Sequence, residues 1–128
     1  MASKSYYLST SLLDYLLRGV AFSAPAGIYV GLFTTSPTPG GGGVEVSGGG
    51  YVRQAATWTP TISGTSSNAG TVTFSPATFP WGTVVAFGLF DAALGGNLLY
   101  FAPMNVPRNI QLNDQIMYPA GQLVVTET

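Results

Sequence analysis

The sequence predicts an all-β protein with an antiparallel β-sandwich or jelly-roll-like body and one short N-terminal α-helix. Two observations lead to this prediction. About seven short β-branched and aromatic segments recur at spacings of roughly 8–14 residues, and helical periodicity of apolar residues is confined to the N-terminal part. The length of 128 residues suits a single domain. We therefore expect one domain over 1–128, with an N-terminal arm and helix at 1–24 and the sandwich at 25–128.

The expected helix covers about ten residues and starts near Ser11. Ser11 is a residue type that caps helix N-termini, Asp14 stands where a capping box has its acidic partner, and Gly19 is a typical C-terminal stop. A helix of this length is not stable alone. We expect its apolar stripe to dock either on the protein's own sheet or on a neighbouring subunit. The stripe consists of Leu8, Leu12, Leu13, Leu16, Leu17 and Val20.

After Pro25 the sequence changes to β character and keeps it. Residues 27–34 are apolar on both faces and predict a buried strand. Residues 83–91 and 98–101 predict a hairpin, with Gly95 and Gly96 in its turn. Further strands are expected at 51–59, 69–75, 110–118 and 123–126, and loops at 35–50, which is rich in Gly and Pro, and at 60–68.

The composition excludes several classes of function. Charged residues make up only 7 % of the chain, against a typical fraction of about 25 %, and four basic residues cannot build a nucleic-acid-binding patch. The absence of His and Cys removes the common nucleophile systems and the usual zinc ligands. We therefore expect no enzymatic activity, no cofactor and no nucleic-acid partner.

No membrane partner is expected either. The most apolar stretch runs from Leu12 to Phe33, but Asp14, Arg18 and Pro25 interrupt it. It therefore contains no run of about 18 uncharged apolar residues, which is the length that a membrane-spanning helix requires.

Two segments of the sequence are candidates for ligand sites. The run of glycines at 40–43 is not followed by Gly-Lys-Ser/Thr, so it predicts a surface loop or a contact with a neighbour rather than a phosphate-binding loop. Asp91, Asn97 and Asp114 offer oxygen ligands for calcium, but Asp and Asn side chains at turns more often bond to their own backbone. We therefore expect no metal site.

The aromatic residues and the scarcity of charge indicate contact surfaces. Trp58 and Trp81, together with Tyr51 and Tyr100, would form either a sugar-stacking surface or, as is commoner in small β-sandwiches, part of the core and an interface. A surface with so few charges suits a subunit that is covered in an assembly. We expect a homo-oligomer, with a trimer favoured, and interface residues among Leu12, Leu13, Leu16, Leu17, Tyr51, Trp58 and Trp81.

Several blocks of sequence resemble a recurrent family of small structural proteins from the virions of tailed bacteriophages. They are residues 12–19 (LLDYLLRG), 22–25 and 28–35, residues 45–54 (EVSGGGYVRQ), and residues 81–84 and 87–100. Members of this family are commonly labelled tail-fibre or minor structural proteins, so the resemblance implies a location in the virion. It brings no catalytic residues.

Two placements in the virion are compatible with this resemblance. A capsid cement or decoration protein would sit between major capsid subunits and stabilise the head, whereas a tail or tail-fibre component would bind other tail proteins. Because the chain contains no long coiled coil or repetitive shaft, we expect capsid cement, with the tail-fibre placement as the alternative. A glycan-binding module is a third reading, which depends on the aromatic residues alone.

Overall fold

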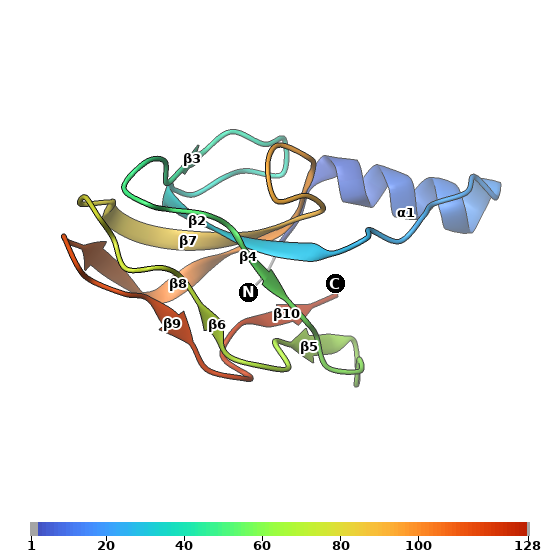
Figure 1. Ribbon diagram of the computed structural model, residues 1–128. Helices are drawn as coiled ribbons and strands as arrows, with labels where there is room; N and C mark the ends of the chain where they lie inside the picture. Colours follow the sequence, from blue (N-terminus) through green and yellow to red (C-terminus); the bar gives the residue numbers. More distant parts are fainter. Residues whose placement is uncertain (1–2, 128) are drawn as a thin grey trace.

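The computed structural model describes residues 3–127 and is built mainly of antiparallel strands with one helix (Figure 1), which confirms the predicted fold class. The elements are β1 (Ser3–Lys4), α1 (Tyr6–Arg18), β2 (Ile28–Thr35), β3 (Val44–Glu45), β4 (Gln54–Ala56), β5 (Thr65–Ser67), β6 (Val72–Thr73), β7 (Gly82–Phe90), β8 (Leu98–Ile110), β9 (Met117–Tyr118) and β10 (Val124–Thr126). In this part of the chain, no helix has the length and apolar character needed to cross a membrane.

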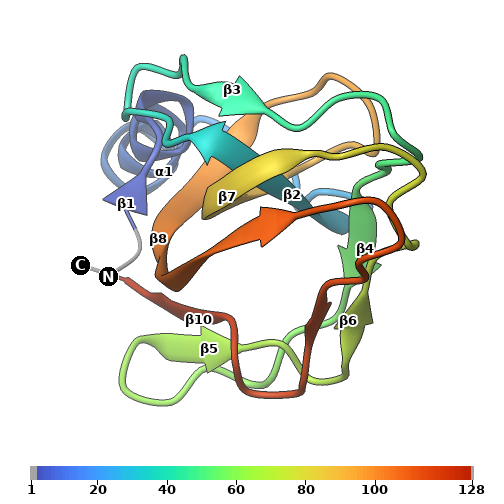
Figure 2. The same cartoon turned by 90° about the vertical axis from the view of Figure 1, so that its left-hand side faces the viewer.

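One large sheet and two small ones form the body. The large sheet has the order β1-β8-β7-β2-β3, and β4 pairs with the first part of β2. The small sheets are the antiparallel pairs β10–β5 and β6–β9. Figures 1 and 2 show both small sheets on one side of the large sheet, so they form the second layer of the sandwich.

The main core fills the space between these layers. Its completely buried side chains come from the large sheet, from β6 with its following segment, and from the C-terminal part of the chain: Val30, Leu32, Phe74, Val84, Ile116 and Leu123. A smaller cluster of Phe33, Ala86 and Phe90 is separate from this core. Since successive residues of a strand point to opposite faces, Leu32 and Phe33 contribute to different clusters.

The helix starts earlier than the sequence predicts. Ser5 is its N-cap, with an extended backbone (φ −70°, ψ 159°), and the Ser5 side chain accepts a hydrogen bond from the Leu8 N–H at 3.2 Å. The predicted cap at Ser11 is therefore wrong, and Asp14 accepts a hydrogen bond from Arg18 at 3.2 Å instead of completing a capping box. The predicted stop at Gly19 is confirmed, since its φ of 68° is the left-handed conformation that glycine adopts easily.

The predicted hairpin is confirmed, but its second strand is much longer than expected. β8 continues to Ile110, so the strand predicted at 110–118 is wrong except for β9. Pro103 lies two residues beyond the predicted end of this strand, and proline cannot donate a hydrogen bond within a sheet. The structure accommodates this stretch with a shift in register: Ala86 pairs with Pro103 and Val84 with Arg108, which leaves residues 104–107 opposite a single residue of β7.

The other strands are shorter than predicted, and two lie in expected loops. Of the strand predicted at 51–59, only β4 forms, and of the strand at 69–75, only β6 forms. The expected loop at 60–68 contains β5, and the loop at 35–50 contains β3. Both additions are strands of two or three residues. β5 pairs with β10 near the other end of the chain, whereas β3 pairs with the nearby end of β2, where Thr35 is opposite Val44.

Candidate functional site

Helix α1 projects beyond the edge of the body (Figure 1), and three of its leucines are exposed to solvent. Leu8, in the first turn, is its one buried residue. Leu13, Leu16 and Leu17 are 56 %, 72 % and 78 % exposed. At about 100° per residue, these three span an arc of about 100° on the helix surface. Leu8 lies well outside this arc, whereas Leu12 lies at its edge, about 40° from Leu16. The four leucines proposed for an interface are thus divided, with Leu12 half-buried and the other three exposed.

The helix is held at its N-terminal end. The Ser5 N–H donates to the Leu99 carbonyl at 2.9 Å, and the Tyr6 N–H donates to the Pro39 carbonyl at 2.7 Å. After Gly19, residues 20–27 lead back to β2 without regular secondary structure. The last turn of the helix, residues 15–18, is exposed.

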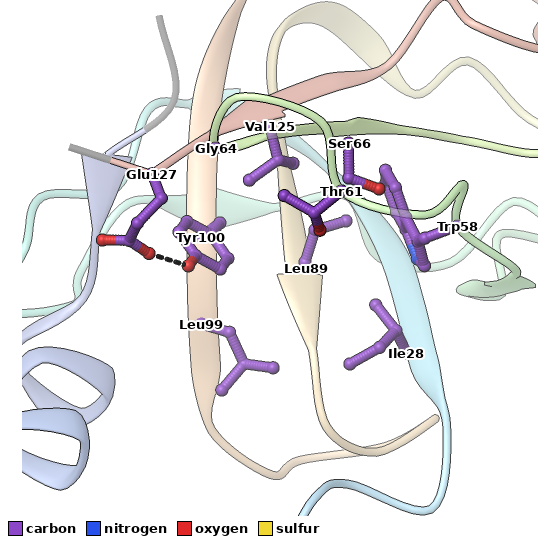
Figure 3. Close-up of a pocket in the computed structure, with 10 residues that line it drawn as sticks. All are labelled: Ile28, Trp58, Thr61, Gly64, Ser66, Leu89, Leu99, Tyr100, Val125 and Glu127. Atoms are coloured by element: carbon purple, nitrogen blue, oxygen red, sulfur yellow. Dashed lines mark hydrogen bonds between the residues drawn. The ribbon is translucent and has the colours of Figure 1, made fainter. Parts of the chain in front are cut away.

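An apolar pocket of about 420 Å³ opens between the two layers of the sandwich (Figure 3). Ile28, Leu89 and Leu99 line it from the large sheet, and Val125 and Trp58 line it from the opposite side. At one edge, the Tyr100 hydroxyl donates to the Glu127 carboxylate at 2.5 Å, and this carboxylate also pairs with Lys4. Burial, with help from the Glu127 hydrogen bond, raises the pKa of Tyr100 well above its usual range. Trp58, a proposed interface residue, thus belongs to a pocket wall, and its buried indole N–H has no hydrogen-bond partner within residues 3–127.

A polar cluster that the sequence analysis missed lies on β3 and the segment that follows it. Arg53 donates from Nε to Glu45 Oε2 and from Nη2 to Glu45 Oε1, each at 2.8 Å. The Tyr51 hydroxyl donates to Glu45 Oε2 at 2.6 Å and accepts from the Leu32 N–H at 2.9 Å. The signal for this cluster was present, because Glu45 and Arg53 are two of only nine charged residues and flank one glycine run.

Partial burial and mutual contacts shift the pKa values of Arg53 and Tyr51 in this cluster. The Arg53 side chain is only 9 % exposed. Burial by itself lowers the pKa of Arg53, but the Glu45 carboxylate more than offsets this, so the pKa lies above its ordinary value. Burial, reinforced by the hydrogen bond to Glu45, raises the pKa of Tyr51 far above its ordinary value. Both groups therefore keep one protonation state throughout the neutral range.

Arg53 also fastens the hairpin turn between β7 and β8. Its Nη1 donates to the carbonyls of Ala92 at 2.9 Å and Gly95 at 2.7 Å, and its guanidinium lies 3.5 Å from the centre of the Phe90 ring. A planar cation with several donors suits such simultaneous contacts. The turn and the segment after β3 are consequently held together by one side chain.

The candidate calcium ligands are used within their own turns. Asp91 accepts from the backbone and the side chain of Asn97, at 2.7 and 3.0 Å, and these hydrogen bonds lower the pKa of Asp91. Asp114 accepts from the Gln111 N–H at 2.9 Å. Within residues 3–127, no three His, Cys, Asp or Glu side chains are grouped so that they could hold a metal ion.

Trp81 lies in the core, and the half-buried Tyr51 packs against it. Trp81 is 6 % exposed, and its indole N–H donates to the Gly49 carbonyl at 2.9 Å. Its ring meets Tyr51 edge to face, with centroids 5.5 Å apart, and Tyr51 stacks on Phe74. These aromatic residues do not form the sugar-stacking surface that was one of their two interpretations.

Gly49 explains why a glycine run precedes this aromatic group. Its φ is +59°, and a Cβ there would lie 2.8 Å from the indole nitrogen of Trp81. Gly43 is similarly confined, since a Cβ would meet the Thr35 carbonyl oxygen at 2.7 Å. The expected loop at 35–50 is therefore tightly turned at these two points.

Comparison with known proteins identifies the family. The model of the family described as podophage GP4 fiber I protein gp80 matches residues 3–126. A search of curated proteins gives no match. Because the match spans nearly the whole sequence, the chain belongs to the podophage GP4 fiber I protein gp80 family, and the predicted relationship to phage virion structural proteins is confirmed.

Proposed function

We propose that this chain is a non-enzymatic structural component of a podophage tail, built into a fibre or its attachment to the tail. The observation that carries the proposal is the match over residues 3–126 to a family described as a fibre protein. It supports the tail-fibre alternative of the sequence analysis better than capsid cement. The surrounding tail proteins are then its partners, in place of the major capsid protein.

The form of the protein suits a segment within such an assembly. Within residues 3–127, the one helix has 13 residues, which corresponds to about 20 Å, so these residues supply no long coiled-coil shaft. The β-sandwich of this chain, with its one projecting helix, suits a subunit that binds other subunits through that helix. Attachment through α1 would leave the two layers of the body unchanged.

Self-association is part of the proposal. Burying a leucine side chain stabilises a contact by roughly 1.5–3 kcal/mol, and α1 offers three such side chains that are more than half exposed. With so few charged residues, electrostatic repulsion between copies is weak. We propose a homo-oligomer, with a trimer as the favoured state.

Position and copy number in the virion test the proposed location. Gold-labelled antibodies against this chain should decorate the tail or its fibres, and quantitative mass spectrometry of purified virions should count a few to a few dozen copies. Labelling over the head with hundreds of copies would contradict the proposal and support capsid cement.

A further inference from the structure

Two apolar features of this chain complement each other but lie apart in a single copy. One is the outer face of α1, formed by Leu13, Leu16 and Leu17. The other is the pocket between the two layers, to whose lining α1 contributes no residue. We propose that these features meet between copies, so that α1 of one copy inserts its outer face into the pocket of the next. This contact rests on the self-association in the proposed function and specifies its geometry.

The pocket has the size and the chemistry for aliphatic side chains. Its volume of about 420 Å³ is within the 300–1,000 Å³ range of pockets that enclose small ligands. Ile28, Leu89 and Val125 supply apolar walls from both layers (Figure 3). Leu13 and Leu17 stand one helical turn apart on the same face, so they can enter one cleft together.

The chain exposes more surface than a typical compact monomer of its mass. A compact monomer of 13.3 kDa exposes about 6,450 Å² according to the usual scaling with mass, whereas this chain exposes 7062 Å². The projecting helix and its return segment provide surface of this kind (Figure 1).

The charges next to the two surfaces are already paired within one copy. Arg18, in the last turn of α1, pairs with Asp14, and Glu127, at the edge of the pocket, pairs with Lys4 and accepts from the Tyr100 hydroxyl. A contact between the helix and the pocket therefore leaves neither of these charges unpaired at its rim.

The contact joins two different surfaces and therefore has a direction. Such heterologous contacts close into rings when the rotation between copies permits it. A ring of three copies, each helix in the next pocket, would satisfy all helices and pockets and agrees with the favoured trimer. A pairing of helices with each other would leave every pocket empty.

Cross-linking distinguishes these arrangements, because the natural chain has no cysteine. Thr61 is an exposed residue of the pocket lining, and Figure 3 shows it among the apolar side chains. We would mix a Leu17→Cys chain with a Thr61→Cys chain of different tag length and oxidise the mixture. The proposal expects mixed dimers to dominate. Dominant Leu17→Cys homodimers would overturn it, and so would a yield of mixed dimers no higher than with a Leu94→Cys control in the exposed turn.

A complementation experiment tests the same contact without cross-links. The Leu13→Ser/Leu17→Ser variant lacks the helix surface, and the Thr61→Trp variant has its pocket filled. Each should sediment as a monomer, while their mixture should form a complex, because one intact helix then meets one intact pocket. Ile62→Trp, at a neighbouring residue that is 75 % exposed and outside the pocket lining, is the matched control and should associate like the natural chain.

Two results of the complementation experiment would contradict the proposed contact. A mixture that stays monomeric would overturn the proposal, as would a Thr61→Trp variant that associates normally. Circular dichroism and urea unfolding establish that each variant is folded, and the cysteine pair tests the contact even if one of them is not. A monomeric natural chain would refute this contact together with self-association, whereas the proposed location in the tail is decided separately by antibody labelling and copy number.

Discussion

Arg53 shows how one residue organises a surface of this protein. It pairs with Glu45 through two hydrogen bonds, covers the Phe90 ring and binds two carbonyls of the β7–β8 turn. Replacing Arg53 by Met should destabilise the protein by about 3 kcal/mol, because the half-buried Glu45 loses its counter-ion. The exposed pair of Arg18 with Asp14 is the control, and Arg18→Met should cost about 0.5 kcal/mol or less. Urea unfolding measures both values, and equal losses would contradict the role of Arg53.

Asp91 gives a prediction about pH at the same scale. Hydrogen bonds from Asn97 lower the pKa of Asp91 in the folded state. The stabilisation is therefore fully present above the ordinary Asp pKa of about 3.9 and disappears as the pH falls through the lower folded value. In urea unfolding between pH 6 and about 2, the difference in stability between the natural chain and Asp91→Ala should shrink with acidification. A difference that stays constant over this range would show that the hydrogen bonds to Asn97 do not favour the ionised carboxylate.

The boundaries of α1 give the clearest prediction for a single element. Ser5→Ala removes the side chain that accepts from the Leu8 N–H, so it should destabilise the protein by about 1 kcal/mol. Ser11→Ala changes a residue in the interior of the helix and should have almost no effect, or a slight stabilising one. Thermal unfolding followed by circular dichroism measures both. The reverse order of the two effects would support the start at Ser11 that local sequence favours.

Local sequence identified elements whose signal is contained in their own residues. The apolar segment that became β2, the hairpin turn around Gly95 and Gly96, and the stop at Gly19 were all found. Local sequence missed β3, although its partner β2 is close in the chain, and it missed features that pairing with more distant residues decides. β5 forms because β10 pairs with it from more than fifty residues away, and β8 continues past Pro103 because β7 pairs with both ends of the irregular segment.

The same distinction applies to the candidate site. The apolar stripe of α1 was visible in the sequence, because helical periodicity is a local property. Whether its leucines would be covered was open, since this depends on how the helix leaves the body. The apolar pocket requires tertiary contacts that spacing along the chain does not reveal. For the Glu45–Arg53–Tyr51 cluster, the sequence shows that two rare charges flank a glycine run, but not that Tyr51 joins them. Trp81 was expected at an interface because tryptophan is common there, but it lies in the core of the protein.

For the whole molecule, few charges and a projecting apolar helix lead to one expectation. The surface of 7062 Å² is larger than a compact chain of this mass needs, and α1 carries exposed leucines on it. An assembly held by apolar contact should resist added salt, because salt screens charges and strengthens apolar burial. We therefore expect self-association that stays unchanged or increases between low and high ionic strength.

Sedimentation velocity of the natural chain and of Leu13→Ser/Leu17→Ser tests the central claim, that copies assemble through α1. The natural chain should sediment as an oligomer, larger than its 13.3 kDa monomer, at both low and high salt. The variant should sediment as a folded monomer. Leu94→Ser, which alters an 88 % exposed leucine outside the helix, should behave like the natural chain. A natural chain that remains monomeric at high concentration, or a variant that keeps the oligomer, would contradict the account.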